Sequence, residues 1–272
     1  MSSSDRRDCR LVFAYRRYLV TADAPRFAWE VAKTYCPSSL ERLLLSSSVE
    51  GRRAAAIALG MVGDRLSIEI LGRALVDRDR GVRLAADDSF RALLVRSAPP
   101  THQHKLLQVM HLNDGGEFAA ALAPALILTD QCGNFAEAYH QLAVCWMGLG
   151  DVLAAEHAYR HCLWICRFHY LAWVGLAHCR LRGEDPTNHD LRTGLRALRR
   201  ALAICPDLEG VRSETRRLER AIENGLLGRR TRSVEENSFF GDDDGEAGEG
   251  DWNPRCGGDP FPGEDGPQDD FV

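Results

Sequence analysis

The sequence has almost no lysine and no long hydrophobic run. Only Lys33 and Lys105 are lysines among 34 basic residues, a bias toward arginine that we attribute to codon usage rather than to function. No apolar stretch approaches the roughly 20 residues that a membrane-spanning helix needs, and the N-terminus lacks the apolar core of a secretory signal. We therefore expect neither a membrane protein nor an exported one, and we predict a cytoplasmic location.

Motifs that would indicate an enzyme are also missing. The sequence has no glycine-rich phosphate loop, no G-x-S-x-G and no H-E-x-x-H. Asp87 and Asp88 are adjacent, so on a helix their side chains point about 100° apart, and we expect both to be solvated. We predict that the protein is not an enzyme, that it has no catalytic residues and that it needs no cofactor.

Charge is distributed unevenly along the chain. The net charge is −5, yet residues 233–272 hold 13 acidic residues and one arginine, so the preceding part is basic. The acidic stretch is rich in glycine and proline and has little apolar area to bury, which favours disorder. We predict a disordered acidic tail over 233–272. It is a solubilising segment in the simpler interpretation and a docking motif, through its scattered aromatic residues, in the alternative.

The first internal repeat lies in a stretch with helical periodicity, where apolar residues recur every three or four positions. A shift of 31 residues superposes Leu40 on Leu71, Arg42 on Arg73, Leu44 on Leu75, Arg52 on Arg83, Ala54 on Ala85 and Ala55 on Ala86. The stretch 51–64, with its run of alanines and its Gly-Asp turn, resembles a HEAT repeat of the short, bilin-lyase-like type. This resemblance implies HEAT-like repeats over 37–98. Two further helices within 1–36 are expected to cap them.

A second repeat has a different period. A shift of 34 residues superposes Tyr139 on Trp173, Leu142 on Leu176, Ala143 on Ala177 and Cys145 on Cys179. Together with Trp146, Ala155, Tyr159 and Cys162, this spacing resembles the tetratricopeptide repeat (TPR). The resemblance implies three TPR-like repeats over 99–208, followed by a capping helix over 209–232. We predict an all-α fold, a right-handed α-solenoid of HEAT-like and then TPR-like hairpins.

Nine cysteines and nine histidines raise the question of a metal site. Cysteines related by the 34-residue repeat lie two helices apart, and packed helices are about 8–10 Å from axis to axis. Zinc–sulfur bonds are about 2.3 Å long, and a disulfide needs Cα atoms within about 7 Å. Cys162 and Cys166 share one helix face, but nothing completes a ligand set around them. We predict buried free thiols and no metal site.

The TPR resemblance also implies a function, because the first helices of such an array line a concave groove that binds peptides. By register, the candidate groove residues are His140, Gln141, Met147, His178 and Arg182. TPR proteins that clamp chaperone C-termini use lysine, asparagine and arginine in this groove. Here His140, Val144 and Val174 stand in those places, so we expect a different ligand. We predict a non-catalytic scaffold or adaptor that binds other proteins or peptides.

Two alternatives remain open at this point. One is nucleic-acid binding by the basic body, with the acidic tail acting as an autoinhibitory competitor. Its candidate residues are the arginines near the HEAT-like turns: Arg52, Arg53, Arg78, Arg80 and Arg83. Such binding would weaken steeply with added salt. The other is a lyase activity, which is implied only by the HEAT resemblance and for which the sequence offers no identifiable site residues.

Overall fold

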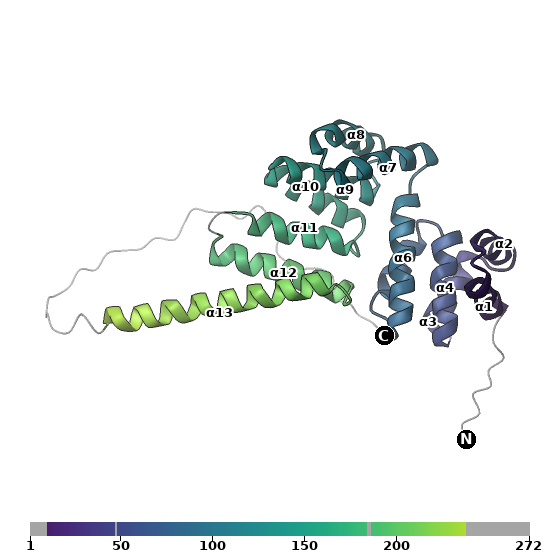
Figure 1. Ribbon diagram of the computed structural model, residues 1–272, viewed down its shortest axis with the longest axis horizontal. Helices are drawn as coiled ribbons and strands as arrows, with labels where there is room; N and C mark the ends of the chain where they lie inside the picture. The colour runs from purple at the N-terminus through teal and green to yellow at the C-terminus, as the bar shows by residue number, and fades with distance from the viewer. Residues whose placement is uncertain (1–9, 47, 184–185, 238–272) are drawn as a thin grey trace, which may run out of the picture. The chain divides into compact units, whose positions relative to one another are not determined.

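The computed structural model describes residues 10–46, 48–183 and 186–237, with side chains described as far as Gly225, apart from that of Ser46. Within these ranges all regular structure is α-helical and no strand occurs, which confirms the all-α prediction (Figure 1). The helices are α1 (Arg10–Thr21), α2 (Ala24–Thr34), α3 (Pro37–Ser46), α4 (Val49–Val62), α5 (Ser67–Ala74), α6 (Arg80–Arg96), α7 (Pro100–Asp114), α8 (Phe118–Gln131), α9 (Ala136–Leu149), α10 (Val152–Ile165), α11 (Tyr170–Leu181), α12 (Asn188–Ile204) and α13 (Glu209–Asn237).

The chain divides into two compact units, Met1–Leu226 and Leu227–Val272. The first contains α1 to α12 and the beginning of α13. Of the second, the described part is the continuation of α13 to Asn237, five residues beyond the expected end of the capping helix. The predicted disordered tail lies outside the described residues from Ser238 onward. No helix in the described part of the chain is long and apolar enough to cross a membrane.

Helix starts in the first unit are marked by short polar side chains and by proline. Asp23 accepts a hydrogen bond from the Arg26 backbone N–H at 3.0 Å and so caps α2, and Asp79 caps α6 through the Val82 N–H at 2.9 Å. These bonds satisfy backbone donors that have no partner inside the helix. Pro25, Pro37 and Pro100 stand in the first turns of α2, α3 and α7. Pro124 does not end α8, which is continuous to Gln131.

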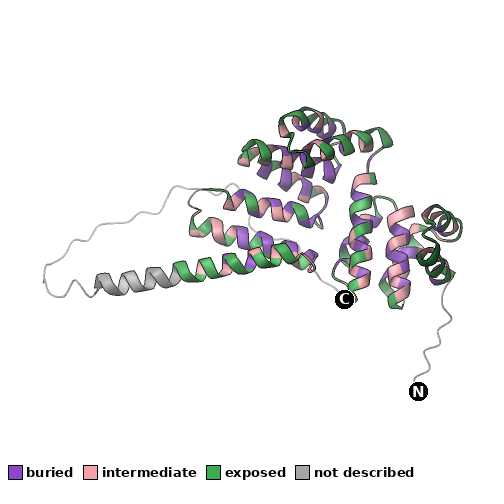
Figure 2. Ribbon diagram, in the orientation of Figure 1, coloured by how far each residue is buried: buried purple, intermediate pink, exposed green. Residues whose placement is uncertain are grey.

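The first six helices pack as neighbours along the chain, with α4 at the centre. Four alanines of α4, Ala54, Ala55, Ala56 and Ala58, are fully buried. Small side chains allow helices to approach closely, and at Gly60 the approach is so close that an added Cβ would lie 2.4 Å from Ser89 Oγ of α6. The contact fixes α4 against α6. Figure 2 shows the buried faces of these helices turned toward one another.

Helices α7 to α12 continue the consecutive packing, each against its neighbours in the chain. Asp151 caps α10 through the Ala154 N–H at 2.9 Å, just after Gly150 ends α9 in the left-handed conformation at φ +88°. Contacts also join α7 with α9 and α9 with α11, which stacks the first helices of the three predicted TPR-like hairpins side by side. This arrangement is compatible with a helical-repeat protein.

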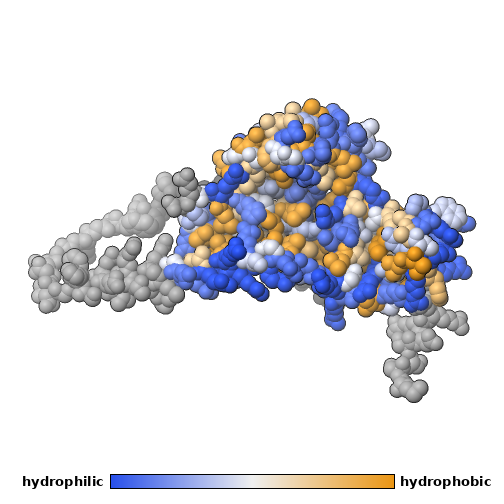
Figure 3. Space-filling view, in the orientation of Figure 1, coloured by the Kyte–Doolittle hydropathy of each residue, from blue (hydrophilic) through white to orange (hydrophobic). Residues whose placement is uncertain are grey.

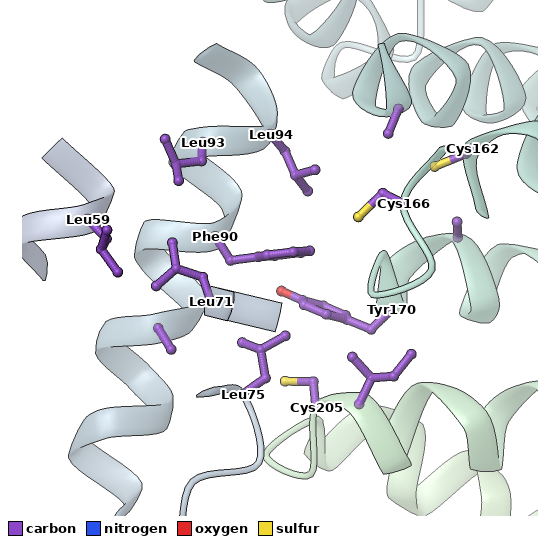
Figure 4. Packing of buried hydrophobic residues seen from close by; sticks show 14 of the residues in the cluster. Leu59, Leu71, Leu75, Phe90, Leu93, Leu94, Cys162, Cys166, Tyr170 and Cys205 are labelled. Atoms are coloured by element: carbon purple, nitrogen blue, oxygen red, sulfur yellow. The ribbon is translucent and has the colours of Figure 1, made fainter. Parts of the chain in front are cut away.

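Helices from α1 to α12 contribute residues to one hydrophobic core. Phe90 of α6 stacks on Tyr170 at the start of α11, with the ring centroids 6.3 Å apart (Figure 4). The Tyr170 hydroxyl donates a hydrogen bond to Asp87 Oδ1 at 2.5 Å. Asp87 is therefore half-buried and paired, and the expectation that it is solvated was wrong. Burial also raises its pKa above the ordinary value of 3.8, against the hydrogen bond from Tyr170.

Cysteines are mostly packing residues, as the repeat register predicted. Among the described cysteines the buried ones are Cys145, Cys162, Cys166, Cys179 and Cys205, and all the described cysteines are free thiols. Burial raises the pKa of Cys166 to about 11, so this thiol stays protonated at neutral pH. Cys36 is an exception, because it is exposed next to two serine hydroxyls.

Candidate functional site

A cavity of about 560 Å³ lies between α6, α7, α9 and the start of α11, within the first unit. One part of its wall is apolar, with Phe90 and Leu94 from α6 and Met110 from α7. The charged side chains that line it are Asp88, Arg91 and Asp114, all exposed, together with the buried Glu137. Apolar and polar side chains therefore both contribute substantially to the lining.

Glu137 is the centre of the polar part of this cavity. It lies in the first turn of α9 and is 7% exposed. Its Oε1 accepts hydrogen bonds from Gln141 Nε2 at 2.9 Å and lies 3.3 Å from His140 Nδ1, while its Oε2 lies 3.0 Å from His169 Nε2. The helical spacing brings residues 137, 140 and 141 onto one face. The result is one carboxylate held between two imidazole rings.

His169 joins this cluster because it is the N-cap of α11. Its Nδ1 accepts a hydrogen bond from the Ala172 backbone N–H at 3.2 Å, which is the role that a serine or aspartate usually fills at this position. Since Nδ1 is the acceptor, the neutral ring carries its proton on Nε2 and donates it to Glu137. The cap therefore fixes both the orientation and the tautomer of the ring.

Electrostatics keep the carboxylate charged and His169 neutral. Burial raises the pKa of Glu137, but the hydrogen bonds to His140 and His169 outweigh it, so the pKa lies well below the ordinary 4.5. Burial lowers the pKa of His169 below 6.5, against the opposing effect of Glu137. At neutral pH the site thus holds an ionised carboxylate that is almost completely out of water.

The network extends from this cluster into the core between α7 and α9. Gln141 Oε1 accepts a hydrogen bond from Asn113 Nδ2 at 2.9 Å, and Asn113 Oδ1 accepts one from Cys145 Sγ at 3.1 Å. Gln141, Asn113 and Cys145 are all buried. Buried polar networks of this kind rigidify the elements that carry them. The floor of the cavity is therefore preorganised.

Two of the five predicted groove residues line this cavity. His140 and Gln141 both face it, although each is only 8% exposed. Sequence reasoning placed them on the first helix of a hairpin but missed their two partners, Glu137 and His169. A signal for Glu137 was present in its spacing, because it stands three residues before His140. His169 stands 34 residues after Phe135, the N-cap of α9, so the repeat period marked it as a cap.

The other three predicted residues lie together, away from the cavity lining. Met147 lies in the last turn of α9, and its backbone oxygen accepts a hydrogen bond from Arg182. His178 on α11 is exposed, and its Nε2 lies 3.1 Å from Glu214 Oε1 on α13. The structure thus divides the predicted groove set into a cavity pair and a group that joins α9, α11 and α13.

Three of the five arginines considered for nucleic-acid binding are engaged in internal ion pairs. Arg52 contacts Asp77 at 2.8 Å, Arg53 contacts Asp79 at 2.9 Å, and Arg83 contacts Asp207 at 2.7 Å. Each pair is joined by two hydrogen bonds, a geometry in which a guanidinium fits a carboxylate well. Arg78 and Arg80 are exposed. Binding phosphates through the first three would break contacts within the fold.

Comparison with known proteins adds no family assignment to this geometry. No protein-family model matches the chain, and no match is found among curated proteins either.

Proposed function

We propose that the protein is a non-catalytic scaffold or adaptor that binds a peptide segment of a partner protein in the cavity between α6, α7, α9 and α11. In this proposal α3 to α6 form HEAT-like hairpins, α7 to α12 form three TPR-like hairpins, and together they build a right-handed α-solenoid. The cavity then lies on the side lined by the first TPR-like helices. That is the side on which helical-repeat arrays bind extended or helical segments.

The observation that carries this proposal is the composition of the cavity. Apolar side chains from two helices can pack against a hydrophobic anchor of the bound segment. Charged residues at the edge of the cavity can form hydrogen bonds or ion pairs with the parts of that segment beside the anchor.

The surface around the cavity favours a protein partner over a small molecule. Large apolar side chains are exposed on the neighbouring helices, among them Leu107, Leu126, Ile127 and Leu149. Figure 3 shows hydrophobic surface over the part that contains α7 to α10, interleaved with hydrophilic residues. Apolar surface mixed with charge at the rim is typical of a protein-binding site.

The test uses the full chain as bait in a nuclease-treated lysate, followed by mass spectrometry and by binding measurements on peptides from the recovered partner. Leu171→Arg places a charge at the edge of the cavity, and we expect it to weaken peptide binding at least about tenfold, equivalent to ~1.4 kcal/mol. The matched control is Leu153→Arg on α10, because Leu153 is also exposed but lies outside the cavity lining. Binding by this control should equal that of the wild type.

The opposite pattern would contradict the proposal. If Leu171→Arg binds normally, or if recovery of the partner collapses on nuclease treatment, the cavity is not the protein-binding site. Paired variants His178→Ala and Arg182→Ala extend the test to the group that joins α9, α11 and α13. A loss of affinity in both would show that the bound segment runs along α11 from the cavity to this group.

A further inference from the structure

The Glu137, His140 and His169 side chains converge as ligands of a metal ion would. Each of them offers one atom, a carboxylate oxygen or a ring nitrogen, and these atoms all lie within 4.8 Å of one another. A tetrahedral ion with bonds of about 2.0–2.1 Å separates its ligand atoms by roughly 3.4 Å. Glu137 Oε1 lies 3.3 Å from His140 Nδ1 and Glu137 Oε2 lies 3.0 Å from His169 Nε2, both slightly shorter than that spacing.

The charge of the cluster is the second observation. Glu137 is buried, and within the described residues the side chains in contact with its carboxylate are His140, Gln141 and His169, with no arginine or lysine among them. An ionised carboxylate held out of water is costly unless a cation balances it. A divalent ion at the point where the three atoms converge would supply that balance.

We propose that Glu137, His140 and His169 form a binding site for a divalent transition-metal ion, with zinc as the ion that its donors fit best. Two imidazole nitrogens and one carboxylate oxygen are a borderline donor set, which suits Zn²⁺ and Fe²⁺ better than Mg²⁺ or Ca²⁺. This proposal departs from the sequence-based prediction of no metal, which considered the cysteines and did not consider these three residues together. It does not depend on the proposed peptide binding.

The ion would keep an open coordination position. The protein supplies three ligands in this cluster, and all three line the cavity of about 560 Å³. Three protein ligands with a free position facing a cavity distinguish accessible zinc sites from closed structural ones. Water, or a carboxylate or imidazole from a bound segment, could complete the coordination.

Binding the ion changes the tautomer of His169. In the structure the Nε2 proton of this ring points to Glu137, and Nδ1 accepts the Ala172 N–H. Coordination through Nε2 moves the proton to Nδ1, with no net change in protonation, and replaces the cap hydrogen bond with a metal bond. A neutral cap bond is weak compared with the binding of zinc by several protein ligands. Replacing the cap hydrogen bond with a metal bond therefore favours binding of the ion. The shift of the His169 proton from Nε2 to Nδ1 is specific to coordination at this ring.

The experiment titrates the purified, chelator-treated full chain with metal ions. Calorimetry measures the binding of Zn²⁺, and absorption spectroscopy measures the binding of Co²⁺. We expect one Zn²⁺ per chain with a dissociation constant below about 1 µM, and a rise in the unfolding temperature that follows from binding to the folded state. Co²⁺ should give weak visible bands without the intense near-ultraviolet band of thiolate ligands, which separates this site from the cysteines.

Two variants assign the ion to the cluster. Glu137→Gln keeps the size of the side chain and removes its charge, while His169→Asn keeps a residue that can cap α11 and removes the ring ligand. Each should weaken Zn²⁺ binding at least about 100-fold. His178→Ala, which removes an exposed histidine outside the cluster, is the control and should bind as the wild type does. Circular dichroism shows whether each variant keeps its helical content. If Glu137→Gln does not fold, the Zn²⁺ binding of His169→Asn alone assigns the ion to the cluster.

Three results would overturn the proposal. They are the absence of saturable Zn²⁺ binding in the wild type, unchanged binding in the folded variants, and a thiolate band with Co²⁺. The first would mean that the cluster is held by hydrogen bonds alone. The other two would place the ion on other residues.

Discussion

At the scale of single residues, one of the closest contacts between helices occurs at Gly175 of α11. A Cβ added there would lie 2.2 Å from Cζ of the buried Tyr159 on α10. The tyrosine ring is enclosed, so it cannot move aside without disturbing its own neighbours. Gly175 is therefore needed for the contact between α10 and α11, which positions His169 at the cavity.

We expect Gly175→Ala to lower the free energy of unfolding by about 1–3 kcal/mol through overpacking. The matched control is Gly225→Ala on α13, where an added Cβ meets no atom within 4 Å. Alanine favours a helix over glycine, so this control should be unchanged or more stable by up to ~1 kcal/mol. Urea denaturation of both variants measures the difference. Equal stabilities for Gly175→Ala and the wild type would contradict the packing argument.

At the scale of helices, the turn between α9 and α10 depends on two residues with different roles. Gly150 adopts the left-handed conformation that ends α9, and Asp151 accepts the Ala154 N–H to begin α10. Asp151 is exposed, so its carboxylate contributes through the cap and little through burial. The helix start can thus be weakened without changing the core.

We predict that Asp151→Ala lowers the free energy of unfolding by about 1 kcal/mol, because the Ala154 N–H loses its acceptor. Asp151→Ser should retain most of the stability, since a serine hydroxyl also caps helices well. Thermal unfolding of the two variants beside the wild type tests the pair. Serine and alanine variants of the same stability would show that the cap contributes nothing here.

The helices were predictable because each is specified by local signals. Apolar periodicity indicated helices, and prolines in the first turns of α2, α3 and α7 mark where three of them begin. The candidate site was predictable only in part. Spacing placed His140 and Gln141 on one helix face, but their cavity also needs α6, which is distant in the sequence. Periodicity reports which face is buried and not what that face meets.

At the scale of the whole first unit, contacts between distant parts of the chain join α6 to the segment that follows α12. Arg83 and Asp207 are 124 positions apart, and their side chains form two hydrogen bonds of 2.7 and 2.9 Å. These hydrogen bonds from Arg83 hold the pKa of Asp207 below its ordinary value of 3.8. No sequence pattern indicated this pair, because neither residue marks its partner.

The lowered pKa of Asp207 links this contact to acid stability. Its folded pKa lies below the unfolded value, so the pair stabilises the fold above pH 3.8 and that contribution is lost as the pH falls through the folded pKa. We expect Asp207→Asn to lower the free energy of unfolding by about 1 kcal/mol at pH 7, the upper range for a partly exposed pair. The difference from the wild type should shrink steadily on acidification below pH 3.8.

Urea denaturation at neutral pH and at the lowest pH where the protein stays folded measures this convergence. Asp88→Asn is the matched control, because Asp88 is an exposed aspartate on the same helix as Arg83, and its loss should leave stability nearly unchanged at both pH values. If the Asp207 variant differs from the wild type by the same amount at both, its effect comes from packing. If the difference from the wild type shrinks at low pH in the Asp207 variant and not in the Asp88 variant, the ion pair holds α6 against the segment that follows α12. It then also holds the wall of the cavity that α6 forms.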